Sequence, residues 1–422
     1  MPSPLHHADA SQKGAKMPFD LSLSTLVLFP AIAVAAPVIA RYVGRLLPVP
    51  LVVFEILLGL VFGPAVLGLI QPGEVSTALA DFGLAMLFFL AGNEINFQAI
   101  RGRPLMRASL GWLISLVAGI ALAAVFAAHL SAAVFIGVAL ASTALGTIMP
   151  VLRDSGDLRT PFGLGILAVG AVGEFGPLLA ISLFLSGRSP MAAAAVLIVF
   201  VIVAGVAIWL AAHGFGRRMH RVITATLHTS GQFAVRLVVF ILLALTALSI
   251  VLGLDMLLGA FTAGVLYRLL LSGAPAEDVE SVEGKLEGVG YGLLVPIFFI
   301  STGVTFDLEA LTSEPGTLLL VPVFLLALAV VRGLPSTLAA PTGSTVRDRV
   351  ATGLFGATGL PIIVAVAGIG VGYGDLTPGT GAALVAAGMC SVLIFPAVGL
   401  MFRKSSTHGP GPKSAPHMPT EV

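Results

Sequence analysis

Long apolar runs, one after another, constrain this chain more than any other feature of its sequence. A helix needs about 20 mostly apolar residues to cross a bilayer, and thirteen runs near that length can be marked along the chain. They cover residues 22–42, 49–70, 78–97, 105–128, 132–152, 161–186, 190–212, 231–253, 255–271, 286–305, 316–339, 349–371 and 378–402. Because lipid offers no hydrogen-bond partners to an open backbone, the sequence predicts an all-α polytopic membrane protein of about thirteen transmembrane helices.

The composition excludes most other classes of protein. Only 10% of the 422 residues are charged and 57% are hydrophobic, whereas soluble domains carry about 25% charged residues, so a soluble enzyme is ruled out. No zinc-protease motif, Gly-rich phosphate loop or activated nucleophile occurs, which leaves an intramembrane hydrolase with little support. The net charge of +1 gives no reason to expect nucleic acid, the eight His show no metal spacing, and Cys390 has no disulfide partner. We therefore expect no enzyme activity and no cofactor.

Both ends of the chain are polar. Residues 1–21 form a polar N-terminal leader, with Met17 as an alternative start, and they do not resemble a signal peptide because the apolar run after them is too long. Residues 22–402 form the membrane domain. Residues 403–422 are rich in Pro, Gly and Ser, and this composition is typical of a disordered tail.

The distribution of basic residues predicts the orientation in the membrane. Of the 22 Lys and Arg, 17 fall in loops on one side of the thirteen segments, three fall on the other side and two lie inside segments. A wrong number of segments would scramble this alternation. By the positive-inside rule, the N-terminus lies outside a plasma membrane and the C-terminus lies in the cytoplasm.

Three short motifs recur seven segments later and in the same order. The pairs are Glu55–Gly59 with Asp255–Gly259, Phe88–Leu90 with Phe298–Ile300, and Ser142–Leu145 with Ala357–Leu360. Any one match is near chance, but three collinear matches are much harder to obtain by accident. Because seven is odd, the two copies cross the membrane in opposite directions. This is the inverted-topology repeat of secondary transporters, whose binding site lies near the midplane where broken helices meet.

The third pair of motifs marks the two segments that we expect to be broken. Ser142 and Thr143 precede Pro150 in one segment, and Thr358 precedes Pro361 in the other. Gly and Pro interrupt the backbone hydrogen bonds of a helix. The N–H and C=O groups left without partners are tolerated in a membrane only beside a polar cavity or buried partner groups. The alternative is that the hydroxyls bond back to their own helices while Gly permits close packing. The pairing of the repeats favours the functional interpretation.

Ionisable residues inside the segments are expensive to insert, and they indicate function by default. Glu174 is the most central, about midway along its segment, and such a carboxylate binds either a proton or a metal cation, but not both at once. Its alternative role is to pair with a neighbouring helix. Arg332 stays charged at any pH, so it is the candidate to neutralise or orient a core carboxylate.

Three other charges inside segments have structural interpretations. Glu55 and Arg236 could form a second buried ion pair that stabilises the fold. Glu94, near the end of its segment, could simply reach the membrane interface.

Eight stretches of the chain are similar to the motifs of a known family: Phe54–Pro64, Leu87–Glu94, Ala141–Ala144, Phe233–Arg236, Leu258–Gly264, Pro296–Gly303, Arg332–Pro335 and Ala357–Pro361. Together they resemble the monovalent cation:proton antiporter-2 family with its sodium/hydrogen exchanger domain. The resemblance covers about residues 22–402. It implies thirteen helices, a core domain with two crossed unwound helices, a separate dimerisation domain, and exchange by an elevator-like movement.

The resemblance also assigns roles to particular residues. Thr143 and its neighbours fall in the first unwound stretch of the family, Glu174 matches its ion-binding carboxylate, and Arg332 matches its core basic residue. Two departures stand out. Many relatives have Asp where this chain has Glu174, often after Asp, Asn or Gln where this chain has Gly173. The nucleotide-binding domain of glutathione-gated potassium efflux relatives is also missing, which disfavours that function.

These observations together predict a homodimeric antiporter that exchanges one monovalent cation, with Na⁺ expected, for one H⁺. The cation would bind Glu174 with help from Ser142, Thr143 and Thr358. One acid with Arg332 resembles the electroneutral type within the family. The alternatives are a K⁺/H⁺ antiporter of the same fold, or a channel or sensor that keeps the fold without exchange. Residue spacing does not decide between Na⁺, K⁺ and Li⁺.

Overall fold

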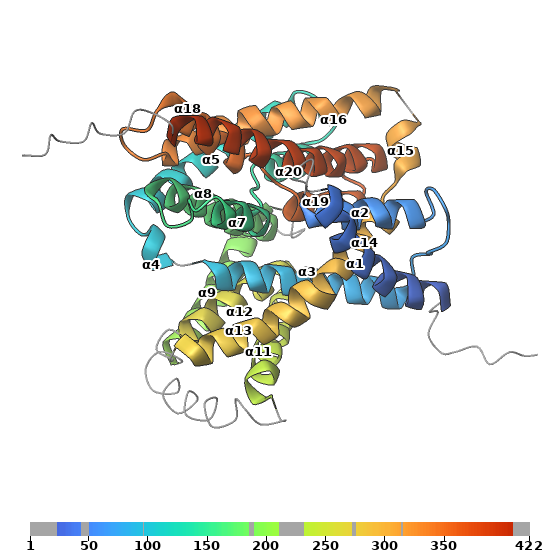
Figure 1. Cartoon of the computed structure of the whole chain (residues 1–422), viewed down its shortest axis with the longest axis horizontal. Coiled ribbons are helices and arrows are strands. Elements are labelled where there is room, and N and C mark those ends of the chain that lie inside the picture. Colours follow the sequence, from blue (N-terminus) through green and yellow to red (C-terminus); the bar gives the residue numbers. More distant parts are fainter. Residues whose placement is uncertain are drawn as a thin grey trace, which may run out of the picture.

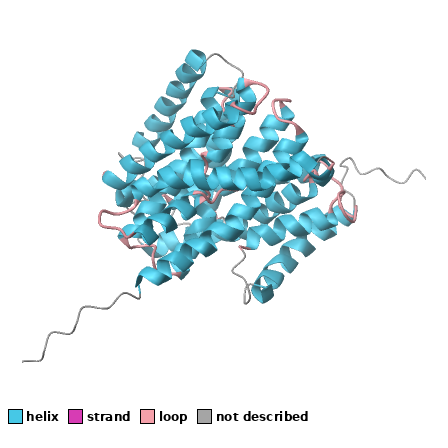
Figure 2. Cartoon of the chain, turned by 90° about the horizontal axis from the view of Figure 1, so that it is seen from above, coloured by secondary structure: helices cyan, strands magenta, loops and turns pink. Residues whose placement is uncertain are grey.

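The computed structural model describes residues 23–43, 50–95, 97–184, 190–210, 232–271, 276–313 and 315–407, and these residues form helices and no strand (Figure 2). The first half contains α1 (Leu23–Val43), α2 (Leu51–Phe62), α3 (Glu74–Glu94), α4 (Phe97–Ile100), α5 (Arg103–Ala124), α6 (Leu130–Leu140), α7 (Leu145–Asp154), α8 (Pro161–Phe184) and α9 (Pro190–Leu210). The second half contains α11 (Phe233–Val251), α12 (Met256–Leu271), α13 (Ala276–Val289), η2 (Gly290–Leu294), α14 (Val295–Val304), α15 (Leu308–Thr312), α16 (Pro315–Ala327), η3 (Leu328–Gly333), α17 (Leu334–Ser336), η4 (Thr337–Ala339), α18 (Val346–Gly356), α19 (Pro361–Gly372) and α20 (Pro378–Thr407).

The helices have the length and the apolar character that a membrane protein requires. Within the described ranges, eight helices are long and apolar enough to cross a bilayer, and α18 with α19 form one more candidate span, bent by 41°. Four shorter apolar helices lie at Val27–Val43, Leu51–Phe62, Met191–Val206 and Met256–Leu271. The all-α polytopic fold is confirmed, while the number thirteen stays a prediction.

The helices pack into two groups. A scaffold domain consists of α1, α2, α3, α11, α12, α13, η2 and α14, and a core domain consists of α5 to α8 and α16 to α20. Figure 1 shows α16, α18 and α20 along one side of the molecule and α11, α12 and α13 along the other, with α3 between them. The helix α9 contacts both α8 of the core domain and α12 of the scaffold domain.

Glycines set the close contacts of the scaffold domain, where α2 packs on α14 and α3 packs on α12. A Cβ atom at Gly303 of α14 would collide with the Ile56 carbonyl oxygen of α2, and one at Gly264 of α12 would collide with the Phe89 carbonyl oxygen of α3. Exchanging the two halves of the sequence repeat converts one of these helix pairs into the other. The packing therefore agrees with the inverted repeat that the motifs predicted.

Two broken helices lie at the centre of the core domain. The chain unwinds between α6 and α7 and again between α18 and α19. The two breaks cross, because the Ala144 amide of the first donates to the Thr358 carbonyl oxygen of the second at 2.8 Å. One amide and one carbonyl that the breaks free are thus satisfied by each other, as a membrane interior requires.

At one end of the core domain, Arg403 of α20 joins two other segments. It donates to Asp157, which precedes α8, at 2.9 Å and to Asp348 of α18 at 3.0 Å. Because α20 continues to Thr407, the first residues of the predicted tail are helical. The predicted leader at residues 1–21 and the rest of the tail lie outside the described residues.

Candidate ion-binding site

Glu174 lies near the middle of α8 and is only 4% exposed. Its Oε1 accepts a hydrogen bond from the Leu145 amide at 2.8 Å. Its Oε2 is buried and has no hydrogen-bond partner among the described residues. One carboxylate oxygen is therefore held in place while the other is free, and such a buried, unsatisfied acceptor is costly unless something binds it.

The break between α6 and α7 explains why the Leu145 amide is available. Leu145 is the first residue of α7, so its N–H has no carbonyl partner one turn earlier in the same helix. The positive end of a helix also favours a negative charge beside it. The unwound stretch thus positions Glu174 by offering a backbone donor that an unbroken helix would not have.

Thr143 connects the first break to its surroundings on three sides. Its amide donates to the Gly173 carbonyl oxygen of α8 at 3.0 Å, and its hydroxyl donates to the Gly356 carbonyl oxygen of α18 at 2.6 Å. The same hydroxyl oxygen accepts from Arg332 Nε at 2.8 Å. Thr143 therefore joins α8, the second broken helix and Arg332.

Arg332 is fully buried in the π-helix η3. Besides Thr143, it bonds the Val169 carbonyl oxygen of α8 through Nη2 at 2.9 Å, and its Nη1 has no partner among the described residues. No ion pair joins Arg332 to Glu174 among the described residues. The structure thus brings Arg332 to the first break and to α8 but does not pair it with the Glu174 carboxylate.

Gly173 makes this arrangement possible. A Cβ atom at this position would lie 2.5 Å from Thr143 Cβ and 2.6 Å from Arg332 Nη2. A side chain has no space at this position, because the Thr143 side chain and the Arg332 guanidinium occupy it. The clustering of glycines along α8 was the only signal for it in the sequence.

Two of the predicted ligands bond back to the helix that precedes their break. The Ser142 hydroxyl donates to the Ala139 carbonyl oxygen of α6 at 2.7 Å, and the Thr358 hydroxyl donates to the Leu354 carbonyl oxygen of α18 at 3.1 Å. These bonds are the ones that the alternative interpretation expected, and they leave the hydroxyl oxygens with lone pairs. Thr358 takes part in the crossing through its carbonyl oxygen instead.

Ser391 of α20 completes the second break, and sequence reasoning missed it. Its Oγ accepts from the Gly359 amide at 3.1 Å and lies 2.7 Å from the Gly388 carbonyl oxygen, to which it donates. It is fully buried. No signal in the sequence indicates Ser391, because the segment around it has the composition of an ordinary apolar span.

The predicted pair of Glu55 and Arg236 does not form in the structure. Glu55 is 3% exposed on α2, whereas Arg236 is exposed on α11, and no ion pair joins them within the described ranges. The helix α2 packs on α14, while α11 packs on α12. The sequence could indicate that both residues lie inside segments but not which segments are neighbours.

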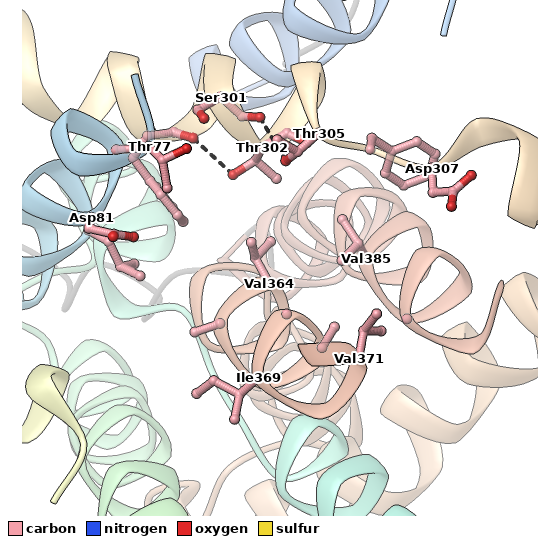
Figure 3. A pocket seen from close by; sticks show the side chains of 18 of the residues that line it. Thr77, Asp81, Ser301, Thr302, Thr305, Asp307, Val364, Ile369, Val371 and Val385 are labelled. Atoms are coloured by element: carbon pink, nitrogen blue, oxygen red, sulfur yellow. Dashed lines mark hydrogen bonds between the residues drawn. The ribbon is translucent and has the colours of Figure 1, made fainter. Parts of the chain in front are cut away.

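A cavity of about 640 Å³ separates the two domains at the end where α3 begins. Figure 3 shows Thr77, Asp81 and Thr302 of the scaffold domain on one wall and Val364 and Ile369 of α19 on the other. At the opposite end, a cavity of only about 30 Å³ lies between Glu94 and the core domain. Among the described residues, the larger of these two cavities therefore lies at the end where α3 begins.

Comparisons with known proteins agree with this architecture. Residues 32–400 match the family described as "Sodium/hydrogen exchanger, transmembrane". The chain is 28% identical to the putative Na⁺/H⁺ antiporter YjbQ of Bacillus subtilis over 74% of its own length and 52% of that protein, so it spans about half of this relative. It is 25% identical to the Na⁺/H⁺-K⁺ antiporter GerN of Bacillus cereus, over 82% of this chain and 88% of GerN.

The structure is also similar in fold to the sodium proton antiporter MjNhaP1 of Methanocaldococcus jannaschii. The TM-score is 0.62, with 16% sequence identity, and the superposition covers 91% of this chain and 96% of MjNhaP1.

Proposed function

Because the chain belongs to the sodium/hydrogen exchanger transmembrane family, we propose that it is a secondary active antiporter that exchanges a monovalent cation for a proton at Glu174. The observation that supports this proposal is the buried Oε2 atom of Glu174, which has no partner among the described residues. A deprotonated carboxylate there binds a cation, and protonation releases it. One site that holds either ion, but not both, couples the two fluxes.

The surrounding residues form the polar wall of this site. The Leu145 amide holds Oε1, so Oε2 is the oxygen that the cation or proton meets. The hydroxyls of Ser142, Thr143 and Thr358 donate to backbone carbonyls. We propose that their oxygens, together with carbonyls of the two breaks, complete the ligation of the transported cation.

The exchange is expected to be electroneutral, with one cation for one proton. Glu174 is the one carboxylate at the crossing of the described broken helices, and Arg332 keeps its charge throughout the cycle. Alternating access would come from movement of the core domain against the scaffold domain, which would close the 640 Å³ cavity and open the opposite end. We further propose a homodimer in the plasma membrane, with the N-terminus outside and the C-terminus in the cytoplasm.

Na⁺ is the expected cation, and K⁺ is the alternative. The name of YjbQ specifies Na⁺, whereas that of GerN includes K⁺ as well. A channel or sensor on the same fold is less favoured, because a buried carboxylate with one free oxygen beside two crossed breaks is what exchange requires. The channel would conduct cations without moving protons.

Transport by the purified protein in lipid vesicles tests this function. A Na⁺ gradient should drive proton movement in the wild type, and Glu174→Gln should abolish it because the amide cannot exchange a proton for a cation. Exchange should fall as the pH is lowered, and more Na⁺ should move this fall to lower pH because the two ions compete. Glu309→Gln is the matched control, since Glu309 is exposed on α15, and it should transport normally.

The same vesicles test stoichiometry and selectivity. An imposed membrane potential should not change the driving force of a one-to-one exchange, and a panel of Na⁺, K⁺ and Li⁺ ranks the cations. Full Na⁺-driven proton movement by Glu174→Gln would refute the proposed function.

A further inference from the structure

We propose that Glu94 and Tyr291 form a second, transient site for the transported monovalent cation, on the scaffold domain between the cytoplasm and Glu174. The inference rests on the proposed function and deepens it. It assigns a binding role to a carboxylate that the sequence suggested would only reach the membrane interface.

The contacts of Glu94 show a carboxylate with one oxygen held and one free. Glu94 ends α3, and its Oε1 accepts a hydrogen bond from the Tyr291 hydroxyl at 3.0 Å. Its Oε2 is buried and has no partner among the described residues. Glu94 thus repeats, at the edge of the scaffold domain, the arrangement that Glu174 has in the core domain.

A local departure from α-helical geometry presents Tyr291 to Glu94. Tyr291 belongs to the π-helix η2, which lies directly against α3, since a Cβ atom at Gly290 would lie 2.6 Å from Leu90 Cδ1. Single π-helical turns inside α-helices are found frequently at functional sites. The turn places a phenol donor from a distant part of the sequence over the end of α3.

Glu94 lies across a small cavity from the residue that holds Glu174. The 30 Å³ cavity beside it has walls from Glu94 and Ile95 on one side and from Leu145 and Leu167 of the core domain on the other. The Leu145 amide is the group that holds Glu174. A volume of this size can hold a water molecule, and the two carboxylates are near enough for their charges to interact.

The neighbouring basic groups leave the free oxygen of Glu94 available. Arg153 and Arg268 are near enough to act on it electrostatically, as is the negative Glu287. Arg268 Nη1 donates to the Asn93 carbonyl oxygen at 3.0 Å and lies 4.0 Å from Glu283. No ion pair to Glu94 forms within the described part of the chain. A deprotonated Glu94 can therefore bind a cation without first breaking an ion pair.

Because Glu94 belongs to the scaffold domain and Glu174 to the core domain, movement of the core would bring Glu174 toward Glu94 or away from it. A carboxylate at the mouth raises the local concentration of cations. Glu94→Gln should therefore raise the cytoplasmic Na⁺ concentration for half-maximal exchange, by on the order of 10-fold, and change the maximal rate less. Tyr291→Phe, which removes only the hydroxyl, should give a smaller shift in the same direction.

The experiment measures Na⁺-driven proton movement in vesicles with Na⁺ varied separately on each face of the protein. Glu280→Gln is the matched control, since Glu280 is an exposed carboxylate on α13, and it should keep the wild-type half-maximal concentration. A wild-type half-maximal concentration for Glu94→Gln on the cytoplasmic face would overturn the inference.

An equal shift on both faces would also overturn it, because a site at one mouth acts on one face. If Glu94→Gln does not fold, Tyr291→Phe makes the same test. A wild type without exchange would refute the proposed function instead, so the two failures are distinguishable.

Discussion

The two breaks at the centre of the core domain each separate two short helices but bond to different side chains. Glu174 accepts from the Leu145 amide at the first break, and Ser391 accepts from the Gly359 amide at the second. In the inverted repeat, α8 and α20 occupy corresponding places, each following its broken helix. The fold is therefore nearly symmetric, whereas its chemistry is not, since only the first break has a group that can change its charge.

The difference extends to the threonines that the repeat pairs. Thr143 bonds Arg332 and the opposite broken helix, while Thr358 turns its hydroxyl back to Leu354. Buried charge thus gathers at the first break, and the second break is held by neutral hydrogen bonds. We infer that the second break mainly fixes backbone geometry, whereas the first binds the ions. Substitutions at the two breaks test this division.

Among the residues that hold the two breaks together, the largest effect is expected from Arg332→Ala. It removes the donors to the Thr143 hydroxyl and the Val169 carbonyl, and each buried acceptor left unsatisfied costs about 1–3 kcal/mol. We expect a lower melting temperature and a loss of most exchange in vesicles. Arg236→Ala is the matched control because Arg236 is exposed on α11. Wild-type exchange by Arg332→Ala would show that the first break functions without the buried guanidinium.

Much of this architecture could be predicted from the sequence, because its signals are local. Apolar length gives the helices, the motifs give the repeat, and the cost of charge in a membrane singles out Glu174 and Arg332. The contacts between distant segments could not be predicted. The Ser391 bond to Gly359 and the fit of Gly173 against Arg332 depend on which helices are neighbours. The predicted ion pair between Glu55 and Arg236 was wrong for the same reason.

Glycine substitutions compare the two breaks directly, with an intermediate effect expected. A methyl group at Gly173 would meet Thr143 Cβ at 2.5 Å and Arg332 Nη2 at 2.6 Å, whereas one at Gly359 would meet nothing closer than Ser142 Oγ at 3.1 Å. Gly173→Ala should therefore slow exchange and lower the melting temperature more than Gly359→Ala, because the guanidinium and the first break must shift. Transport and thermal unfolding of both variants provide the measurement. Equal effects would show that the first break is not the more tightly constrained one.

The smallest effect is expected from Ser391→Ala. The substitution leaves the Gly359 amide without its buried acceptor, at a cost of about 1–3 kcal/mol, but it removes no charge and no group that contacts Glu174. The melting temperature should fall, while the Na⁺ concentration for half-maximal exchange stays near that of the wild type. Ser115→Ala is the matched control, since Ser115 is also fully buried but bonds only Gly111 of its own helix. A several-fold change in the half-maximal Na⁺ concentration for Ser391→Ala, absent in the control, would show that the second break also takes part in ion binding. It would contradict the inference that only the first break binds the ions.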